Sequence, residues 1–300
     1  MSKSRTGVSP VEERLERELE VIGKLGFETY FLVAWDIARF ARERGIRFHV
    51  RGSAVNSLVV HCLGISAVDP LEYDLLFERF MHLGRREMPD IDWDFQRTRR
   101  DEVRDHLQQK YGKENVAAVA TISTYRARGV AREVGKALGL PQRFIEEVLQ
   151  GVRWQSFSSI LGRTGVSPVN EARLPSMDAQ VKTFLRLCSA LDGFPSHLSV
   201  HLGGLVIGPA GSGLTSLTPL QWTTGGDIIS QYDKDDIEKL GLIKMDIIPV
   251  PTLDVIEDSL TEIKRNRGIE VNIDAVPRDD HAVFAMHRRS ETIGAFQVES

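Results

Sequence analysis

The residues best suited to chemistry lie between positions 88 and 95, where aspartates alternate with large apolar side chains. The alternating residues are Asp90, Ile91, Asp92, Trp93, Asp94 and Phe95. A period of two is typical of a β-strand, and it would place the carboxylates on one face and the apolar side chains on the other. Residues two apart on a strand are separated by roughly 6.5 Å, so such carboxylates can converge on one cation or bridge two. Mg²⁺ prefers oxygen ligands and often shares them with substrate phosphates, so it is the ion that this pattern indicates.

A second stretch, residues 241–248, has the same alternation of charged and apolar residues. Lys244 and Asp246 lie on one predicted face, and the other face is apolar. If the two strands are neighbours, Asp246 adds a carboxylate to the metal site, and Lys244 adds a cation for a phosphate or for the acids. The alternative is an ordinary edge strand at residues 88–95 with its acids in water. Like charges repel and aspartate is rare in strands, which counts against that alternative.

An anion site is predicted at Gly52 and Ser53, which lie between a short strand candidate at 46–50 and an apolar helix at 58–63. A Gly-Ser pair at such a junction leaves backbone N–H groups and a hydroxyl free at the positive end of the helix. A triphosphate is the ligand that fits this arrangement. The alternative is that Ser53 is an ordinary helix N-cap.

Composition sets the broader limits. With 300 residues, 42% of them hydrophobic, the chain predicts a sizeable core and more than one domain. No apolar run is long enough to span a bilayer, and the polar N-terminus lacks the core of a signal peptide. Cys62 and Cys188 have no metal-ligand spacing, which favours a reducing cytoplasm. The net charge of −4 does not indicate nucleic-acid binding, so any basic surface must be local.

Apolar periodicity predicts several further elements. Helices are expected at 11–25, 29–44, 69–81, 97–111, 125–138 and 251–265, and strands at 116–122, 201–208 and 227–232. Paired glycines within 201–208 indicate close backbone approach. In the helix at 125–138, Arg128, Arg132 and Lys136 fall four apart on one face. Such a row can follow a phosphate backbone, and it is equally typical of a solvated helix face.

The segment Arg-Thr-Gly-Val-Ser-Pro-Val occurs twice, at 5–11 and at 163–169. It is too short and too isolated for a structural repeat. We interpret it as inserted or duplicated surface sequence.

Taken in order, the motifs resemble those of the C-family DNA polymerases, the α subunits of bacterial DNA polymerase III. The motifs are Arg-Gly-Ser-Ala at 51–54, Asp-Leu-Leu-Phe-Glu-Arg-Phe at 74–80, Pro-Asp-Ile-Asp-Trp-Asp-Phe at 89–95 and Gly-Leu-Ile-Lys-Met-Asp at 241–246. Residues 51–57, 194–198 and 232–236 are more similar to the error-prone, damage-tolerant branch than to the main replicase.

The resemblance implies an α/β to α+β fold: a nucleotidyltransferase palm of the polymerase-β type with an inserted helical thumb. The implied domains are palm at 1–122, thumb at 123–200, palm again at 201–250 and the start of the fingers at 251–300. By position, Asp90, Asp92 and Asp246 match the family's catalytic, metal-binding carboxylates, and Asp94 does not. Nucleotide-binding positions are Gly52, Ser53, Arg79 and Lys244.

The implied activity is DNA-directed DNA synthesis with two Mg²⁺ ions, acting on primer-template DNA and a deoxynucleoside triphosphate, in replication or repair of damaged DNA. Other polymerase or replisome subunits are the expected partners, in the cytoplasm and without a membrane. Because the family's N-terminal PHP domain and most of its fingers are missing from this sequence, a truncated, non-catalytic remnant that binds DNA or a partner is one alternative. A nucleotidyltransferase acting on something other than DNA is another.

The sequence departs from the family's pattern at two places. His49 and Val50 stand where the family usually has glycine before Arg-Gly-Ser, and residues 247–251 read Ile-Ile-Pro-Val-Pro where a leucine- and glycine-bearing run is usual. The first departure would stiffen the Gly52–Ser53 turn, and the second falls at the junction between palm and fingers.

Overall fold

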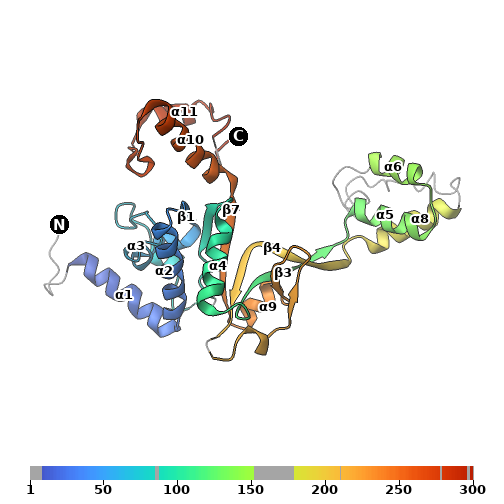
Figure 1. Ribbon diagram of the computed structural model, residues 1–300, viewed down its shortest axis with the longest axis horizontal. Coiled ribbons are helices and arrows are strands. Elements are labelled where there is room, and N and C mark those ends of the chain that lie inside the picture. The colour runs from blue at the N-terminus through green and yellow to red at the C-terminus, as the bar shows by residue number, and fades with distance from the viewer. Residues whose placement is uncertain are drawn as a thin grey trace. The chain divides into compact units, whose positions relative to one another are not determined.

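The computed structural model describes residues 9–84, 88–151, 179–209, 211–277, 279–295 and 298–299. The chain divides into two compact units, one made of Met1–Val119 with His201–Ser300 and the other of Ala120–Val200. Among the described residues, seven strands form one mixed sheet in the order β1-β2-β7-β4-β3-β6-β5 (Figure 1). The fold class predicted from the sequence, a mixture of helices and a sheet, is therefore confirmed at this level.

The strands are β1 (Phe48–Arg51), β2 (Asp92–Gln96), β3 (Val116–Thr124), β4 (Pro195–Ile207), β5 (Leu220–Trp222), β6 (Ile228–Ser230) and β7 (Ile243–Val250). Strand β2 runs antiparallel to β1 and parallel to β7, and β7 runs antiparallel to β4. The two acid-bearing stretches of the sequence are therefore adjacent strands.

The helices of the first unit that precede the return of the chain are α1 (Pro10–Leu25), α2 (Glu28–Glu43), α3 (Leu58–Cys62) and α4 (Arg100–Tyr111). Helix α1 begins with a capping box: the Ser9 hydroxyl accepts the Glu12 N–H at 3.2 Å, and the Glu12 carboxylate accepts the Ser9 N–H at 2.9 Å. It ends at Gly26, whose φ of +75° is the left-handed conformation that glycine adopts without strain.

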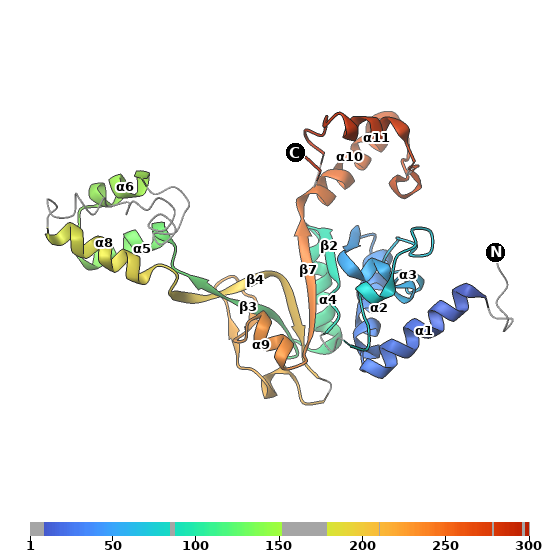
Figure 2. The ribbon, with the colours of Figure 1, turned by 180° about the vertical axis from the view of Figure 1, so that it is seen from behind.

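The apolar residues that alternate with the aspartates build the core behind β2. Trp93 and Phe95 are fully buried and stack with ring centroids 5.9 Å apart. Phe48 of β1 packs against both rings at 5.5 Å. Helix α4 contacts α2 and also lies along β7 (Figure 2). Burial of this face of β2 leaves the aspartates on the opposite face, because side chains alternate along a strand.

Strand β4 approaches β7 closely through its paired glycines. Gly204 lies opposite Asp246 in the register of the two strands. A Cβ atom on Gly203 would lie 3.1 Å from the backbone oxygen of Ile247 in β7, and one on Gly204 would lie 2.7 Å from His201 Nδ1 in β4 itself. That His201 nitrogen accepts the Gly204 N–H at 2.6 Å. The close backbone approach predicted for 201–208 is confirmed.

The second unit contains helices α5 (Ala127–Ala137), α6 (Gln142–Gly151) and α8 (Ala179–Leu191), with the adjoining parts of β3 and β4. Its core consists of Ala127, Val130, Ala131, Val134, Ile145, Phe184 and Cys188. Strand β4 begins at Pro195, so the last residues of the range expected to be a helical thumb are extended. The second copy of the repeated segment, 163–169, lies outside the described residues, as does most of the first.

After β6 the chain forms α9 (Lys234–Lys239), and after β7 it forms α10 (Pro251–Arg267) and α11 (His281–Arg288). Pro251 occupies the start of α10, where a missing N–H costs nothing and the fixed φ suits a helix. None of the described helices is long and apolar enough to cross a membrane.

Two expectations about local structure differ from the structure. The helix expected at 69–81 is wrong: only the short 3-10 helix η2 (Phe77–Arg79) forms there. Asp69 Oδ1 accepts the Leu71 N–H at 2.8 Å, and Asp74 has a φ of +49°, so the chain turns before a helix can start. Strand β2 begins at Asp92, so Asp90 and Ile91 precede it rather than belonging to it.

Candidate active site

Strand pairing brings the acids of the two stretches together. Asp92 lies directly opposite Asp246 in the parallel pair of β2 and β7, and Asp90 lies just before β2. A carboxylate oxygen can be chosen from each of Asp90, Asp92 and Asp246 so that the three atoms lie within 4.8 Å of one another. We call these three residues the acid cluster. Three carboxylates at this separation repel one another, so the cluster needs cations close to it.

Lys244 supplies one of those cations from within β7. Its Nζ lies 2.5 Å from Asp246 Oδ2 and 3.3 Å from Asp90 Oδ1, and its side chain is only 6% exposed. Burial by itself would lower the pKa of this amine, but the hydrogen bond and the charge of Asp246, followed by Asp90, outweigh it and raise the pKa. Lys244 is therefore a fixed positive charge between the first and last members of the cluster.

Arg51, at the end of β1, neutralises the other side. Its Nη1 lies 3.4 Å from Asp92 Oδ2, and its Nε donates to Asp94 Oδ1 at 3.0 Å and to Oδ2 at 3.2 Å. Asp94 is thereby engaged with the guanidinium and lies outside the acid cluster. Asp94 follows Asp92 on β2, but it lies opposite Ile248 rather than Asp246 and binds the Arg51 guanidinium.

The donor set fits a divalent cation. Asp246 Oδ1 is buried and has no hydrogen-bond partner in the described part of the chain. A buried carboxylate oxygen without a partner is costly, and a cation would satisfy it. Burial raises the pKa of Asp92, an effect that Arg51 opposes and that Asp90 and Asp246 reinforce. The three acids can therefore hold an oxygen-ligated ion of the Mg²⁺ type, which would relieve both the missing partner and the repulsion.

The Gly52–Ser53 turn lies directly beside this cluster. It belongs to the 3-10 helix η1 (Gly52–Asn56), which follows β1, and the φ of Gly52 is +83°. A Cβ atom at Gly52 would lie 3.6 Å from Asp92 Oδ2. Ser53 is exposed and caps no helix, because the hydroxyl that accepts the Val60 N–H at the start of α3 is that of Ser57. The N-cap alternative is therefore wrong for Ser53.

The remaining candidate residues lie elsewhere. Arg79 is exposed at the end of η2, an element that contacts η1. Arg128, Arg132 and Lys136 are exposed on α5 in the second unit, and Lys136 Nζ lies 3.4 Å from Glu133 Oε1. The structure thus gathers Gly52, Lys244 and the acid cluster at one place, and leaves the α5 row as a separate feature.

One residue near the acids carried no sequence signal. Tyr30 of α2 is 1% exposed, and its hydroxyl accepts the N–H of Ile91, between Asp90 and Asp92, at 3.0 Å. Burial and then the charge of Asp90 raise the pKa of Tyr30 well above its usual range, so it is a neutral phenol. In the sequence it is one apolar-face residue of a helix among several, and its hydroxyl is the only feature that sets it apart from its neighbour Phe31.

Two models of known protein families match the chain. The family model described as the bacterial DNA polymerase III alpha NTPase domain matches residues 3–249, and that of the bacterial DNA polymerase III alpha subunit finger domain matches residues 252–300. The chain belongs to the bacterial DNA polymerase III alpha family.

Within that family, the chain is similar to proteins named error-prone DNA polymerase. It is 41% identical over 296 residues to the one from Methylococcus capsulatus and 38% identical over 291 residues to the one from Symbiobacterium thermophilum; each match covers 97% of this chain. It is 39% identical over 310 residues to one from an Anaeromyxobacter species. The chain spans only about a quarter of the length of these relatives, 27%, 26% and 27% respectively.

Proposed function

We propose that this chain is the nucleotidyl-transfer part of an error-prone DNA polymerase, which joins a deoxynucleoside triphosphate to a primer 3′-hydroxyl on a DNA template. The observation that carries the proposal is the acid cluster: Asp90, Asp92 and Asp246 converge from two adjacent strands in a chain of this family. The error-prone role is supported by the names of the relatives described above.

Asp90, Asp92 and Asp246 would hold two Mg²⁺ ions. When bound, such ions activate the attacking hydroxyl and neutralise charge on the phosphates of an in-line displacement. The side chains of the protein itself position the ligands and balance their charge. Asp246 offers its buried Oδ1, which has no partner among the described residues, and Lys244 and Arg51 offset the negative charge of the acids. The Lys244 ammonium would also offer a positive charge to a phosphate.

The Gly52–Ser53 turn would bind the triphosphate. The turn lies next to Asp92, so its backbone N–H groups would be close to phosphates bound at the acid cluster, and the exposed Ser53 hydroxyl could donate to a phosphate oxygen. Arg79, on an element that contacts the same turn, would add a positive charge. Replacing Ser53 should therefore weaken nucleotide binding more than DNA binding.

In the proposed organisation, residues 1–122 and 201–250 form a palm of the polymerase-β type, residues 123–200 a thumb, and residues 251–300 the start of the fingers. Arg128, Arg132 and Lys136 on α5 would contact the phosphate backbone of primer-template DNA. The protein would act in the cytoplasm, together with other subunits of the replication or repair machinery.

Mg²⁺-dependent primer extension by the polymerase that contains this chain tests the proposal. Asp246→Asn should lower the rate by about a thousandfold or more, since a metal's charge stabilisation is worth several kcal/mol. Asp94→Asn is the matched control, because this acid is bound by Arg51 and lies outside the cluster. Equal losses in both variants would show that the ligands are assigned wrongly, and full activity of Asp246→Asn would refute the active site.

A further inference from the structure

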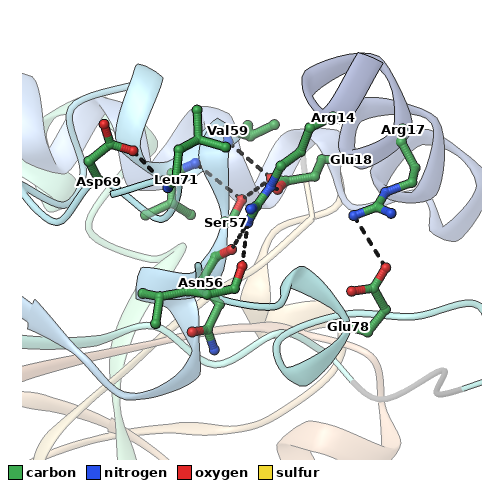
Figure 3. A network of polar contacts seen from close by, with 11 residues as sticks. Arg14, Arg17, Glu18, Asn56, Ser57, Val59, Asp69, Leu71 and Glu78 are labelled. Atoms are coloured by element: carbon green, nitrogen blue, oxygen red, sulfur yellow. Dashed lines mark hydrogen bonds and ion pairs between the residues drawn. The ribbon is translucent and has the colours of Figure 1, made fainter. Parts of the chain in front are cut away.

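Helix α1 carries a buried ion pair that no part of the proposed chemistry uses. Arg14 Nε donates to Glu18 Oε1 at 3.0 Å, and the two side chains are 15% and 0% exposed (Figure 3). Burying a charge pair is costly unless further hydrogen bonds satisfy both partners. Both side chains form such further hydrogen bonds.

Glu18 fixes the end of the Gly52–Ser53 turn. Its Oε2 accepts the Ser57 hydroxyl at 2.8 Å and the Val59 N–H at 3.1 Å. Ser57 is the residue that follows η1 and caps α3, so the carboxylate sets where the turn stops and the helix begins. A carboxylate at the N-terminal end of a helix is also favoured by the exposed N–H groups there.

Arg14 joins two separate segments. Its Nη2 donates to the carbonyl oxygen of Asn56, the last residue of η1, and to that of Leu75, each at 2.8 Å. Leu75 lies two residues before η2, which ends at Arg79. Figure 3 shows the Arg14 guanidinium next to Glu18 and joined by a dashed line to Asn56. One side chain thus ties together the two segments that carry Gly52, Ser53 and Arg79.

The same helix offers a contrast. Arg17 Nη2 lies 3.4 Å from Glu78 Oε1, with the two side chains 55% and 52% exposed. Exposed pairs of this kind contribute little, whereas a buried guanidinium held by a carboxylate and two carbonyl groups has one geometry only. The Arg14–Glu18 pair therefore determines the position of the backbone segments that it binds, and does not only balance charge.

We propose that the Arg14–Glu18 pair is a positioning device for the triphosphate site, holding the Gly52–Asn56 turn and the Arg79 segment at a fixed separation. The inference rests on the proposed function, because it takes the ligand of that turn to be the triphosphate of a nucleotide. Neither residue touches the nucleotide; both act through the backbone of the segments that do.

Steady-state primer extension by the polymerase that contains this chain, with dATP varied, tests the inference. Arg14→Lys keeps the charge, but Arg14 uses two nitrogens, Nε for Glu18 and Nη2 for both carbonyl groups, and a single ammonium nitrogen cannot occupy both positions. The KM for dATP should rise about tenfold, the effect expected when charge-assisted hydrogen bonds that hold a binding loop are lost. The kcat and the Kd for primer-template DNA should stay within about twofold of wild type.

Arg17→Lys is the matched control, with the same substitution three residues along the same helix at an exposed pair, and its KM should not change. If Arg14→Lys proves poorly folded, Glu18→Gln, which has the same shape and keeps one acceptor for Ser57, should raise the same KM. An unchanged KM in both Arg14→Lys and Glu18→Gln would overturn the inference. A fall in kcat and in DNA affinity as large as the change in KM would also overturn it. Absence of extension by the wild-type polymerase would instead overturn the proposed function.

Discussion

Asp36 and the acid cluster, both in the first unit, differ in how their carboxylate oxygens are partnered. Asp36 of α2 is 1% exposed, and both of its oxygens have hydrogen-bond partners. Lys110 Nζ lies 2.6 Å and Arg39 Nη2 3.1 Å from Oδ1, and His106 Nε2 lies 2.9 Å from Oδ2. Burial alone would raise the pKa of Asp36, but hydrogen bonds from Lys110, His106 and Arg39 outweigh it, so the pKa is lowered.

The acid cluster has the reverse balance. Its members repel one another, the pKa of Asp92 is raised by burial, and Asp246 Oδ1 has no partner in the described structure. An acid whose oxygens are all bound within the protein stabilises the fold, here by joining α2 to α4. An acid left short of partners is available to an external cation. The difference separates structural acids from candidate ligands more clearly than burial does.

Helix α2 carries Asp36 and also a tyrosine that binds the backbone of the acid cluster. Its Tyr30 accepts the Ile91 N–H between two cluster acids, and its Asp36 holds α4. The comparison can therefore be tested by substitutions along one helix and in the strand that it supports.

Asp36→Ala should have the largest effect on stability. Removing the carboxylate breaks its hydrogen bonds with Lys110, Arg39 and the mostly buried His106, and a loss of about 2–3 kcal/mol in the free energy of unfolding is expected. Urea denaturation of this chain measures it. Asp105→Ala, at an exposed acid on α4, is the control and should change the free energy by less than about 0.5 kcal/mol. A loss below about 1 kcal/mol for Asp36→Ala would mean that an acid whose oxygens all have partners in the protein is not thereby a structural acid.

Tyr30→Phe should have an intermediate effect on stability. The Ile91 N–H would lose its acceptor inside the protein, at a cost of about 1–2 kcal/mol. The backbone between Asp90 and Asp92 would also lose its anchor, so primer extension should need several times more Mg²⁺ for half-maximal rate. Tyr232→Phe, at a partly buried tyrosine packed against a different core, is the control. An unchanged Mg²⁺ requirement would show that Tyr30 serves the fold alone.

Asp92→Asn should have the smallest effect, and its sign should depend on pH. Because the folded-state pKa of Asp92 is raised, its charged form costs stability at neutral pH, and that cost disappears as the pH falls through the folded-state pKa. The variant should be slightly more stable than wild type at pH 7, by less than about 1 kcal/mol, with the gap closing on acidification. For Asp36→Asn the gap has the opposite sign and also closes in acid, since a lowered pKa gives stability that protonation removes. Urea unfolding from pH 7 down to about pH 3 distinguishes these cases, because the Asp92→Asn gap should close above the usual carboxyl pKa of about 4 and the Asp36→Asn gap only below it. An Asp92→Asn gap that did not vary with pH would contradict the account.

Much of this site is predictable from residue spacing, because a period of two on a strand determines which side chains share a face. Spacing places Asp90, Asp92 and Asp94 on one face and Lys244 with Asp246 on another, and only the resemblance to the polymerase family leaves Asp94 out of the ligands. What spacing cannot supply is the register of strands far apart in sequence, which places Asp92 opposite Asp246. Nor does it predict that Arg51 forms an ion pair with Asp94, because that contact depends on the pairing of β1 with β2.

The errors have similar causes. The stretch at 69–81 has helical periodicity, yet the Asp69 side chain and the left-handed Asp74 impose turns that periodicity does not detect. The Arg14–Glu18 pair reads in the sequence as an ordinary i, i+4 pair on a helix surface. Its burial and its hydrogen bonds depend on Asn56 and Leu75, which lie 42 and 61 residues from Arg14 in the sequence.

The most direct test of the central claim is a titration of this chain with Mn²⁺, followed by electron paramagnetic resonance of the free ion. The account predicts that wild-type chain binds Mn²⁺, that Mg²⁺ displaces it, and that Asp246→Asn weakens binding by more than about tenfold while Asp94→Asn leaves it within about twofold. Loss of Mn²⁺ binding in Asp94→Asn equal to that in Asp246→Asn, or no binding by the wild-type chain, would contradict the assignment of the acid cluster as the metal site.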